Sequence, residues 1–158
     1  MDAGWNGGSL LARPNKGWSK LDLGNLNGSI AFDGKVVREE PIPVKDGPSI
    51  HDCQITENYV LVFDLPAVFS MKRLVSGFSF PFHWNPDHGT RLGLLPRNGR
   101  GEDTIWCTID EPCYVYHPAN AYETADGKVV VDVVVHESTY DRSPRGPGGK
   151  WVRYERWV

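Results

Sequence analysis

The chain has 158 residues, enough for one ordinary domain with a buried core. Its formal net charge is −3 with acidic and basic residues interspersed, so it has no broad positive field, and nucleic acid and anionic membranes are poor partners. The 17 glycines and 12 prolines separate short apolar runs rich in Val, Ile, Tyr, Phe and Trp. This composition predicts an all-β protein with many turns.

The three cysteines, Cys53, Cys107 and Cys113, are an odd number without paired CxxC spacing. This pattern argues against a disulfide framework and against a thiolate zinc site, and favours buried thiols in a reducing compartment. The N-terminus lacks the basic and apolar regions of a secretory signal, and no stretch approaches about 18 uninterrupted apolar residues. We therefore expect a soluble, cytoplasmic protein.

The N-terminal segment, residues 1–26, is rich in Gly, Asn and Lys and shows little periodicity. We expect it to form a loop or a poorly ordered leader ahead of a single domain over residues 27–158. Early in that domain, Asp33-Gly34 lies between two extended runs and predicts a hairpin. Pro41 and Pro43 cannot donate ladder hydrogen bonds, which places the second strand at a sheet edge or ends it early.

Four antiparallel strands are predicted next, the number found in one blade of a β-propeller. They are expected over residues 50–56, 58–64, 91–95 and 104–109. The run of five apolar residues from Tyr59 to Phe63 favours a strand that is covered on both faces.

Residues 67–77, between the second and third of these strands, can form a short helix. The aromatic stretch that continues through Phe78, Phe80 and Phe82 has two interpretations. It can form an apolar substrate mouth or a membrane-touching patch, or it can pack in the ordinary way under a loop, which is the simpler interpretation.

A second cycle of strands follows over residues 114–122, 128–136 and 151–158, with a turn at 125–127 and a loop rich in Pro and Gly over 143–149. The whole pattern predicts the tail of one blade, one complete blade and three strands of another.

Two histidines stand at matching places in the two cycles, 66 positions apart. Each is followed six residues later by a glutamate, giving the pairs His51 with Glu57 and His117 with Glu123. A repeated unit with one imidazole in each copy suggests an architecture that points histidines at a shared axis. Because neutral imidazole is a common ligand of iron, zinc and copper, both histidines are candidate metal ligands, although two donors are too few for tight binding.

The remaining histidines have structural interpretations. His83 and His88 lie in a polar, turn-like segment in which proline and glycine make a helix improbable, and His136 ends a valine-rich strand as a solvated terminus. Glu57 and Glu123 can orient an imidazole, but a plain surface or turn role fits them equally well.

Four segments together resemble the carotenoid cleavage oxygenase family, which includes the retinal pigment epithelial membrane protein and the lignostilbene dioxygenases. Ser49 to Tyr59 is similar to the segment around that family's second iron ligand, and Tyr116 to Glu123 is similar to the segment around its third. The stretches Phe63 to Pro66 and Trp84 to Gly89 continue the likeness. The family usually has Phe before the third ligand, where this chain has Tyr116.

This resemblance implies a seven-bladed β-propeller with Fe(II) on its axis, held by four histidines of which three are braced by glutamates. His51 and His117 are then iron ligands. The implied reaction is the cleavage of a carbon–carbon double bond of a carotenoid, apocarotenoid or stilbene by O₂, which gives two carbonyl products. The implied substrates are therefore apolar, and peripheral membrane contact by the full-length protein is possible.

The chain also departs from the family pattern. No histidine precedes His51, and His136 follows His117 too closely to be the fourth ligand. The bracing glutamates fall outside the chain, so Glu57 and Glu123 do not take that role. With about two of seven blades, we expect the polypeptide to be inactive and prone to aggregation by itself.

Three hypotheses follow. The chain is a piece of an iron-dependent oxygenase, or a non-enzymatic remnant or module that binds an apolar ligand or a partner, or a unit of which several copies assemble into a ring. Two further histidines encoded in similar contexts by the neighbouring DNA would support the enzyme, and size-exclusion chromatography would test the ring.

Overall fold

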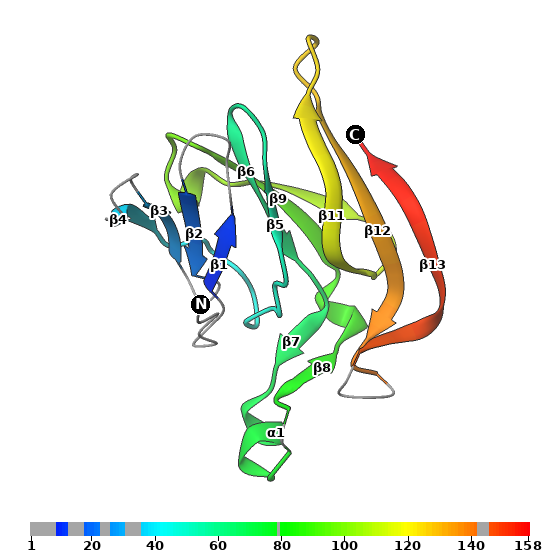
Figure 1. The fold of residues 1–158 in the computed structure, drawn as a ribbon. Helices are drawn as coiled ribbons and strands as arrows, with labels where there is room; N and C mark the ends of the chain where they lie inside the picture. The colour runs from blue at the N-terminus through cyan, green and yellow to red at the C-terminus, as the bar shows by residue number, and fades with distance from the viewer. Residues whose placement is uncertain (1–8, 13–17, 23–25, 31–35, 79, 142–145) are drawn as a thin grey trace.

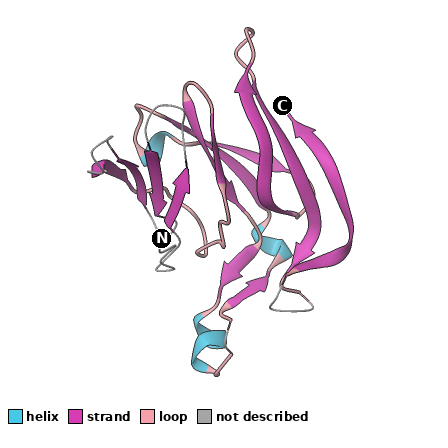
Figure 2. Ribbon diagram, in the orientation of Figure 1, coloured by secondary structure: helices cyan, strands magenta, loops and turns pink. Residues whose placement is uncertain are grey.

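The computed structural model describes residues 9–12, 18–22, 26–30, 36–78, 80–141 and 146–158, with side chains from residue 40 onward. Most of the described chain is β-strand, with short helical segments between strands (Figure 2). Three antiparallel sheets lie side by side, and a small two-stranded arm projects from them (Figure 1). The all-β prediction is confirmed.

The N-terminal sheet has four strands in the order β1-β2-β3-β4. The strands are β1 Ser9–Ala12, β2 Trp18–Asp22, β3 Leu26–Ile30 and β4 Val36–Glu40. The loop expected over residues 1–26 therefore contains two strands, because the pairing of β1 with β2 and of β2 with β3 outweighs the weak local pattern of a polar segment. β3 and β4 pair as expected for a hairpin, while its Asp33-Gly34 turn lies outside the described residues.

The central sheet is the complete four-stranded unit that the sequence predicts, in the order β10-β9-β6-β5. Its strands are β5 Cys53–Ile55, β6 Tyr59–Asp64, β9 Thr90–Pro96 and β10 Ile105–Ile109, with a 3-10 turn η2 at Gly101–Asp103 before β10. β6 is buried from Val60 to Asp64, so both of its faces are covered. This confirms the interpretation of its unbroken apolar run.

The third sheet has the three strands that the second cycle predicts, in the order β11-β12-β13. They are β11 Tyr114–Glu123, β12 Val129–Thr139 and β13 Pro147–Trp157. β12 runs through the middle of this sheet and is mostly buried, which explains its long valine-rich sequence.

The arm consists of β7 Ala67–Phe69, helix α1 Met71–Val75 and β8 Phe82–Trp84, followed by the 3-10 turn η1 at Pro86–His88. α1 is shorter than the helix expected over residues 67–77. The first part of that segment pairs with β8 as a strand, and the Ser70 side chain accepts a hydrogen bond from the Arg73 backbone N–H and caps the helix.

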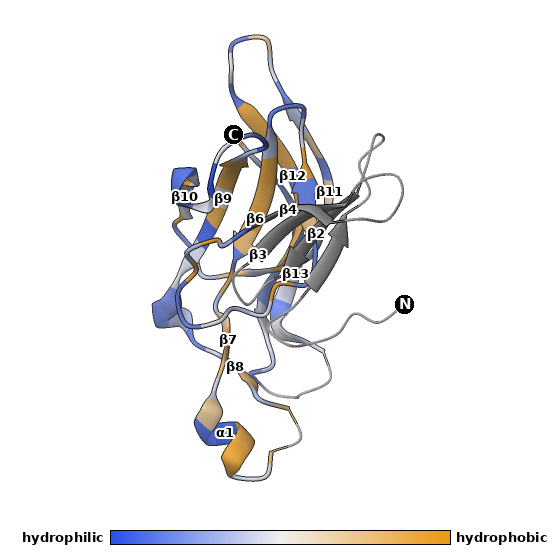
Figure 3. Cartoon of the chain, turned by 90° about the vertical axis from the view of Figure 1, so that its left-hand side faces the viewer, coloured by the Kyte–Doolittle hydropathy of each residue, from blue (hydrophilic) through white to orange (hydrophobic). Residues whose placement is uncertain are grey.

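The core lies on both faces of β6, because successive side chains of a strand point in opposite directions. Leu61 and Phe63 belong to a cluster shared with β9, β11 and β12, whereas Val60 and Val62 belong to a cluster with Ile42 and other residues on the opposite face. Figure 3 shows the hydrophobic residues concentrated along β6, β9 and β12. The central and third sheets therefore share one hydrophobic core.

All three cysteines are free thiols, but only two of them are buried. Burial raises the pKa of the Cys113 thiol to about 11 and raises that of Cys53 further still, which makes both unreactive. Cys107 is exposed on β10, contrary to the expectation that all three are buried, because β10 is the edge strand of the central sheet. Among the described residues, the helices are too short and too polar to cross a membrane.

Candidate metal centre

His51 lies just before β5, on a segment that is pinned on both sides. Ile50 and Cys53 are buried in the core beside it. Two residues before His51, the Ser49 backbone N–H donates a hydrogen bond to the Ala67 carbonyl at 2.6 Å, and the Ser49 carbonyl accepts one from the Tyr114 hydroxyl at 2.7 Å. The backbone around His51 is thus fixed by the arm and by β11.

His117 lies in a β-bulge of β11. Val115 pairs with Val135 and Pro118 pairs with Val133, so the two residues between them on β11 face a single residue on β12. Such an extra residue kinks a strand and re-aims its side chains, and proline is tolerated there because a bulge interrupts the ladder. The bulge at Tyr116-His117-Pro118 therefore determines the direction of the His117 side chain.

The two predicted ligands come together where the edge strands β5 and β11 of neighbouring sheets meet. The ring centroids of His51 and His117 are 4.7 Å apart, and the ring planes are almost perpendicular at 87°. Two imidazoles that bind one ion at adjacent positions have centroids roughly 4.5–5 Å apart, because each metal–nitrogen bond is about 2.1 Å long. The spacing of this pair fits a shared metal ion.

Asp52 links the two histidine segments. One of its carboxylate oxygens lies 2.9 Å from Nδ1 of His117, and the other accepts a hydrogen bond from the Cys53 backbone N–H at 2.8 Å. A carboxylate beside Nδ1 favours the tautomer in which Nδ1 carries the proton and Nε2 keeps its lone pair. In this tautomer the Nε2 lone pair of His117 is available to coordinate a metal.

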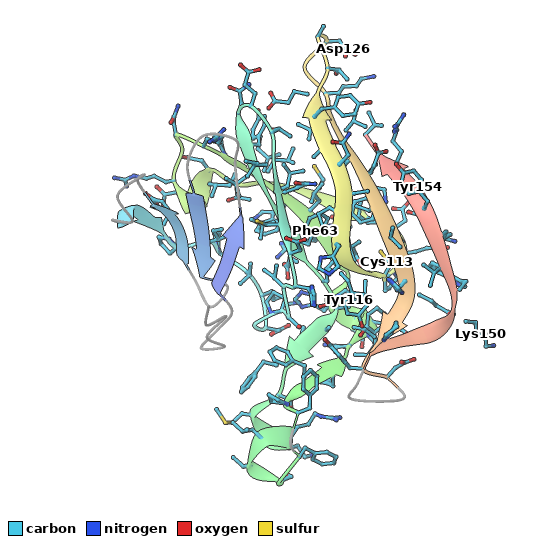
Figure 4. The ribbon with its side chains drawn as sticks, viewed as in Figure 1. Phe63, Cys113, Tyr116, Asp126, Lys150 and Tyr154 are labelled. Carbon is cyan, nitrogen blue, oxygen red and sulfur yellow. The ribbon has the colours of Figure 1, made fainter. Side chains whose placement is uncertain are left out.

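Tyr116 packs between the rings of His51 and His136. Figure 4 labels Tyr116 on β11. Its ring lies 5.3 Å from that of His51 and 5.0 Å from that of His136, and its hydroxyl is 2.5 Å from Oγ1 of Thr139. His136 is half-buried within β12 and is not the solvated strand end that the sequence suggests, because β12 continues to Thr139. Burial lowers the pKa of His136, and its buried Nδ1 has no hydrogen-bond partner.

The surroundings of His51 favour its neutral form. Burial, followed by the neighbouring His117, lowers the pKa of His51, while Asp52 and the Tyr116 backbone act in the opposite direction. Neutral imidazole is the form that binds metal, so these surroundings favour the metal-binding form of His51 over its protonated form.

Across the described ranges, no group of three or more His, Cys, Asp and Glu side chains is arranged to hold a metal ion. The described part of the chain therefore offers a pair of nitrogen donors and a supporting carboxylate. A tightly held divalent ion needs three or four ligands, so tight binding at this pair would require further donors.

Glu123 holds the two hairpins beside the site together. It accepts hydrogen bonds from the backbone N–H and the side-chain amide of Asn58, both at 2.7 Å. Glu57 is exposed at the tip of the β5–β6 hairpin. The repeated His–Glu spacing thus marks equivalent turns, and the turn role is the one that fits these glutamates.

The structural interpretation of His88 agrees with its surroundings. Its Nε2 lies 2.6 Å from the fully buried carboxylate of Asp64, which also accepts a hydrogen bond from Nε of Arg91 at 3.0 Å. Asp46 lies 3.4 Å from Nδ1 of His88. His83 lies separately in β8 of the arm.

The family assignment rests on a comparison with known proteins. The model of the retinal pigment epithelial membrane protein family matches residues 20–151. The chain belongs to this family, the carotenoid oxygenases. A carotenoid cleavage oxygenase of Mycobacterium tuberculosis is 35% identical over 171 residues, covering 82% of this chain and 34% of the relative. A resveratrol cleavage oxygenase of Chaetomium globosum is 34% identical over 65% of this chain and 17% of its own length.

Solved structures of carotenoid oxygenases match the fold. The lignostilbene dioxygenase of Pseudomonas brassicacearum has a TM-score of 0.65 and 28% identity, covering 85% of this chain and 27% of that one. A variant of Synechocystis apocarotenoid oxygenase has a TM-score of 0.62 at 19% identity. The three sheets are thus part of a seven-bladed β-propeller, and the chain spans about a third of the length of the first curated relative it matches.

Proposed function

We propose that this chain is part of an Fe(II)-dependent dioxygenase that cleaves a carbon–carbon double bond of a carotenoid, apocarotenoid or stilbene with O₂. The observation that carries the proposal is the convergence of His51 and His117 from two neighbouring sheets to a centroid distance of 4.7 Å. Membership of a family with carotenoid and resveratrol cleavage oxygenases supports the substrate class.

Each of the described residues would have a separate role in such a site. His51 and His117 would hold the iron through neutral imidazole nitrogens, and Asp52 would keep the Nδ1 proton of His117 in place. Tyr116 would form an apolar wall behind His51. Bound iron would supply the activation of O₂ beside the double bond, and the surrounding protein would orient the substrate.

We also propose that the chain is inactive by itself. It offers two of the four ligands that the family resemblance implies, and a divalent ion held by two imidazoles stays largely hydrated and exchangeable. The side chain of His117 is 68% exposed, so water competes directly for any metal bound there.

The test is to express the chain together with the protein encoded by its flanking DNA and to measure carbonyl products from a polyene and from a stilbene. We expect product formation with iron and O₂, and its loss in His51→Ala and in His117→Ala. His83→Ala, in the arm, is the matched control and should keep the activity. Full activity without both imidazoles would refute the proposal and leave a metal-free binding module as the better hypothesis.

The arm supports a further proposal about partners, namely contact with an apolar or membrane surface. Its exposed large side chains include Met71 at 60%, Val75 at 75% and Phe78 at 55%, with Lys72 and Arg73 among them. Exposed apolar groups beside cations suit a lipid interface. Flotation with phospholipid vesicles should be reduced by Val75→Asp, and unchanged flotation would contradict the contact.

A further inference from the structure

Tyr140, the first residue after β12, has a backbone conformation that a tyrosine rarely adopts. Its φ is +55°, in the left-handed region, where the β-carbon of a bulky residue crowds the backbone. Glycine takes this conformation without strain, so a tyrosine persists here because the surrounding structure holds its side chain in place. The contacts of the Tyr140 side chain therefore indicate what this position does.

The ring of Tyr140 contacts aromatic side chains from two different parts of the fold. Its centroid lies 4.6 Å from that of Phe80 in the arm and 6.2 Å from that of Tyr114 on β11. The ring also packs against the core that the central and third sheets share. β12 reaches the arm at β8 (Figure 1), so Tyr140 lies where the arm, β11 and β12 meet.

The hydroxyl of Tyr140 belongs to a hydroxyl cluster. Burial raises the pKa of Tyr140, and hydrogen bonding to Ser49, Tyr114 and Thr139 opposes that effect. The Tyr114 hydroxyl lies 3.4 Å from Oγ of Ser49, and Oγ1 of Thr139 lies 2.5 Å from the Tyr116 hydroxyl. Because Ser49 and Thr139 are fully buried, bulk water cannot replace these contacts. The hydroxyl cluster consists of Ser49, Tyr114, Tyr116, Thr139 and Tyr140.

This cluster joins the two segments that carry the candidate ligands. Ser49 stands two residues before His51, and Tyr116 stands next to His117. The rings of Tyr116 and His117 both contact the His51 ring, at centroid distances of 5.3 and 4.7 Å. Consecutive residues of a regular strand point to opposite faces, so this double contact depends on the bulge of β11. Whatever fixes Ser49 and Tyr116 therefore fixes His51 against His117.

We propose that Tyr140 is a positioning residue of the candidate metal centre, which holds the rings of His51 and His117 at the distance that one ion requires. It acts through the hydroxyl cluster, whose members belong to both histidine segments and to the end of β12. The role belongs to the side chain, because glycine would form the same turn without strain. Its value for metal binding rests on the proposed function, whereas the distance between the two rings can be measured without metal.

The first test uses the longer protein, free of metal and with isotope-labelled histidine. We expect a nuclear Overhauser effect between the rings of His51 and His117, because their centroids are 4.7 Å apart. Tyr140→Gly keeps the left-handed backbone and removes the side chain, and it should lose this effect. Tyr140→Phe keeps the aromatic ring and should retain it.

Cobalt(II) binding by the same variants is the second test. Competition with a chelator measures the affinity, and the absorption spectrum of the bound cobalt reports the arrangement of its ligands. We expect Tyr140→Gly to weaken binding by about tenfold or more and to change the spectrum, and Tyr140→Phe to stay within about threefold of the wild type.

Tyr59→Ala is the matched control. Tyr59, at the start of β6, is another partly buried tyrosine that packs against the same core. Its replacement should lower the stability to denaturant and leave the cobalt affinity, the spectrum and the nuclear Overhauser effect unchanged.

Wild-type behaviour of Tyr140→Gly in both tests would overturn the proposal, and so would equal losses in Tyr59→Ala, which would assign the effect to core packing in general. Cobalt binding that survives both His51→Ala and His117→Ala would instead refute the proposed function. The nuclear Overhauser effect in the metal-free protein would then decide whether Tyr140 positions the two rings.

Discussion

Asp52 connects the segment that carries His51 to the side chain of His117 by a hydrogen bond. It holds Nδ1 of His117 with one oxygen and the Cys53 backbone N–H with the other, so its position is fixed by the strand that follows His51. The segment that carries one candidate ligand thus supports the other candidate ligand. This contact depends on the approach of β5 to β11, and a single sequence gives no signal of it.

We predict that Asp52→Ala weakens iron binding by the longer protein by about 10–100-fold, because the His117 ring loses the carboxylate that fixes its tautomer. Competition with a chelator measures the change. Asp52→Asn keeps an oxygen acceptor and should have a smaller effect. Equal affinity of the alanine variant and the wild type would show that Asp52 does not orient the ligand.

His88 gives a pH-dependent contribution to stability. The hydrogen bond to Asp64 raises the pKa of His88, against an opposing effect of burial. A group whose pKa is higher in the folded state stabilises the fold at low pH, and this stabilisation is lost as the pH rises through the folded-state pKa.

We predict that His88→Gln costs most stability below about pH 6.5, the usual pKa of histidine, and progressively less at higher pH. Urea unfolding of both proteins at several pH values measures the difference. A difference that stays constant from acid to alkaline pH would indicate that the His88 charge does not contribute.

The sequence identified the two histidines that meet, because the same chemical pattern recurs in both cycles. It did not locate His136 correctly, since the end of a valine-rich run cannot show that the strand continues to Thr139. The glutamates six residues later were left with two interpretations, and the contact of Glu123 with Asn58 joins positions 65 apart that only the tertiary fold brings together.

At the scale of elements, β11 connects the core to the candidate centre. Tyr114 is fully buried and its hydroxyl donates to the Ser49 carbonyl, so the strand that carries His117 also fixes the segment that carries His51. The bulge that follows then turns His117 toward its partner.

We predict that Tyr114→Phe lowers the free energy of unfolding by about 1–3 kcal/mol, because it leaves the buried Ser49 carbonyl without its hydrogen bond. Chemical denaturation measures this. Tyr122→Phe, on the same strand but 39% exposed, is the control and should change stability by less than about 0.5 kcal/mol. Equal effects of the two variants would contradict the role of Tyr114.

Most strands could be predicted from alternation and turn residues, and they were found within a few positions of their expected bounds. The N-terminal strands β1 and β2 and the strand β7 of the arm could not be predicted in this way. β1 is specified by its pairing with β2 and β2 by its pairing with β3, and β7 replaces the first turn of the expected helix because it pairs with β8. In each case pairing with a neighbouring strand decides the local structure, and the weak local pattern does not show that pairing.

At the scale of the whole molecule, three sheets of a propeller bring their inner edges together, and the candidate centre lies where two of them meet. The sequence predicted one complete sheet and one of three strands, and both were found. It understated the N-terminal sheet, which has four strands. The shared axis was suggested by the repeated histidine unit, and the seven-bladed arrangement came from the family resemblance, because periodicity within strands carries no information about how sheets face each other.

Iron analysis of the longer protein tests the central claim that His51 and His117 bind one ion together. The account predicts one iron per chain in the wild type, retained in His83→Ala and lost from both His51→Ala and His117→Ala. Each variant should keep the wild-type circular dichroism spectrum. Full iron content in either of these two variants would show that the two imidazoles do not share a metal.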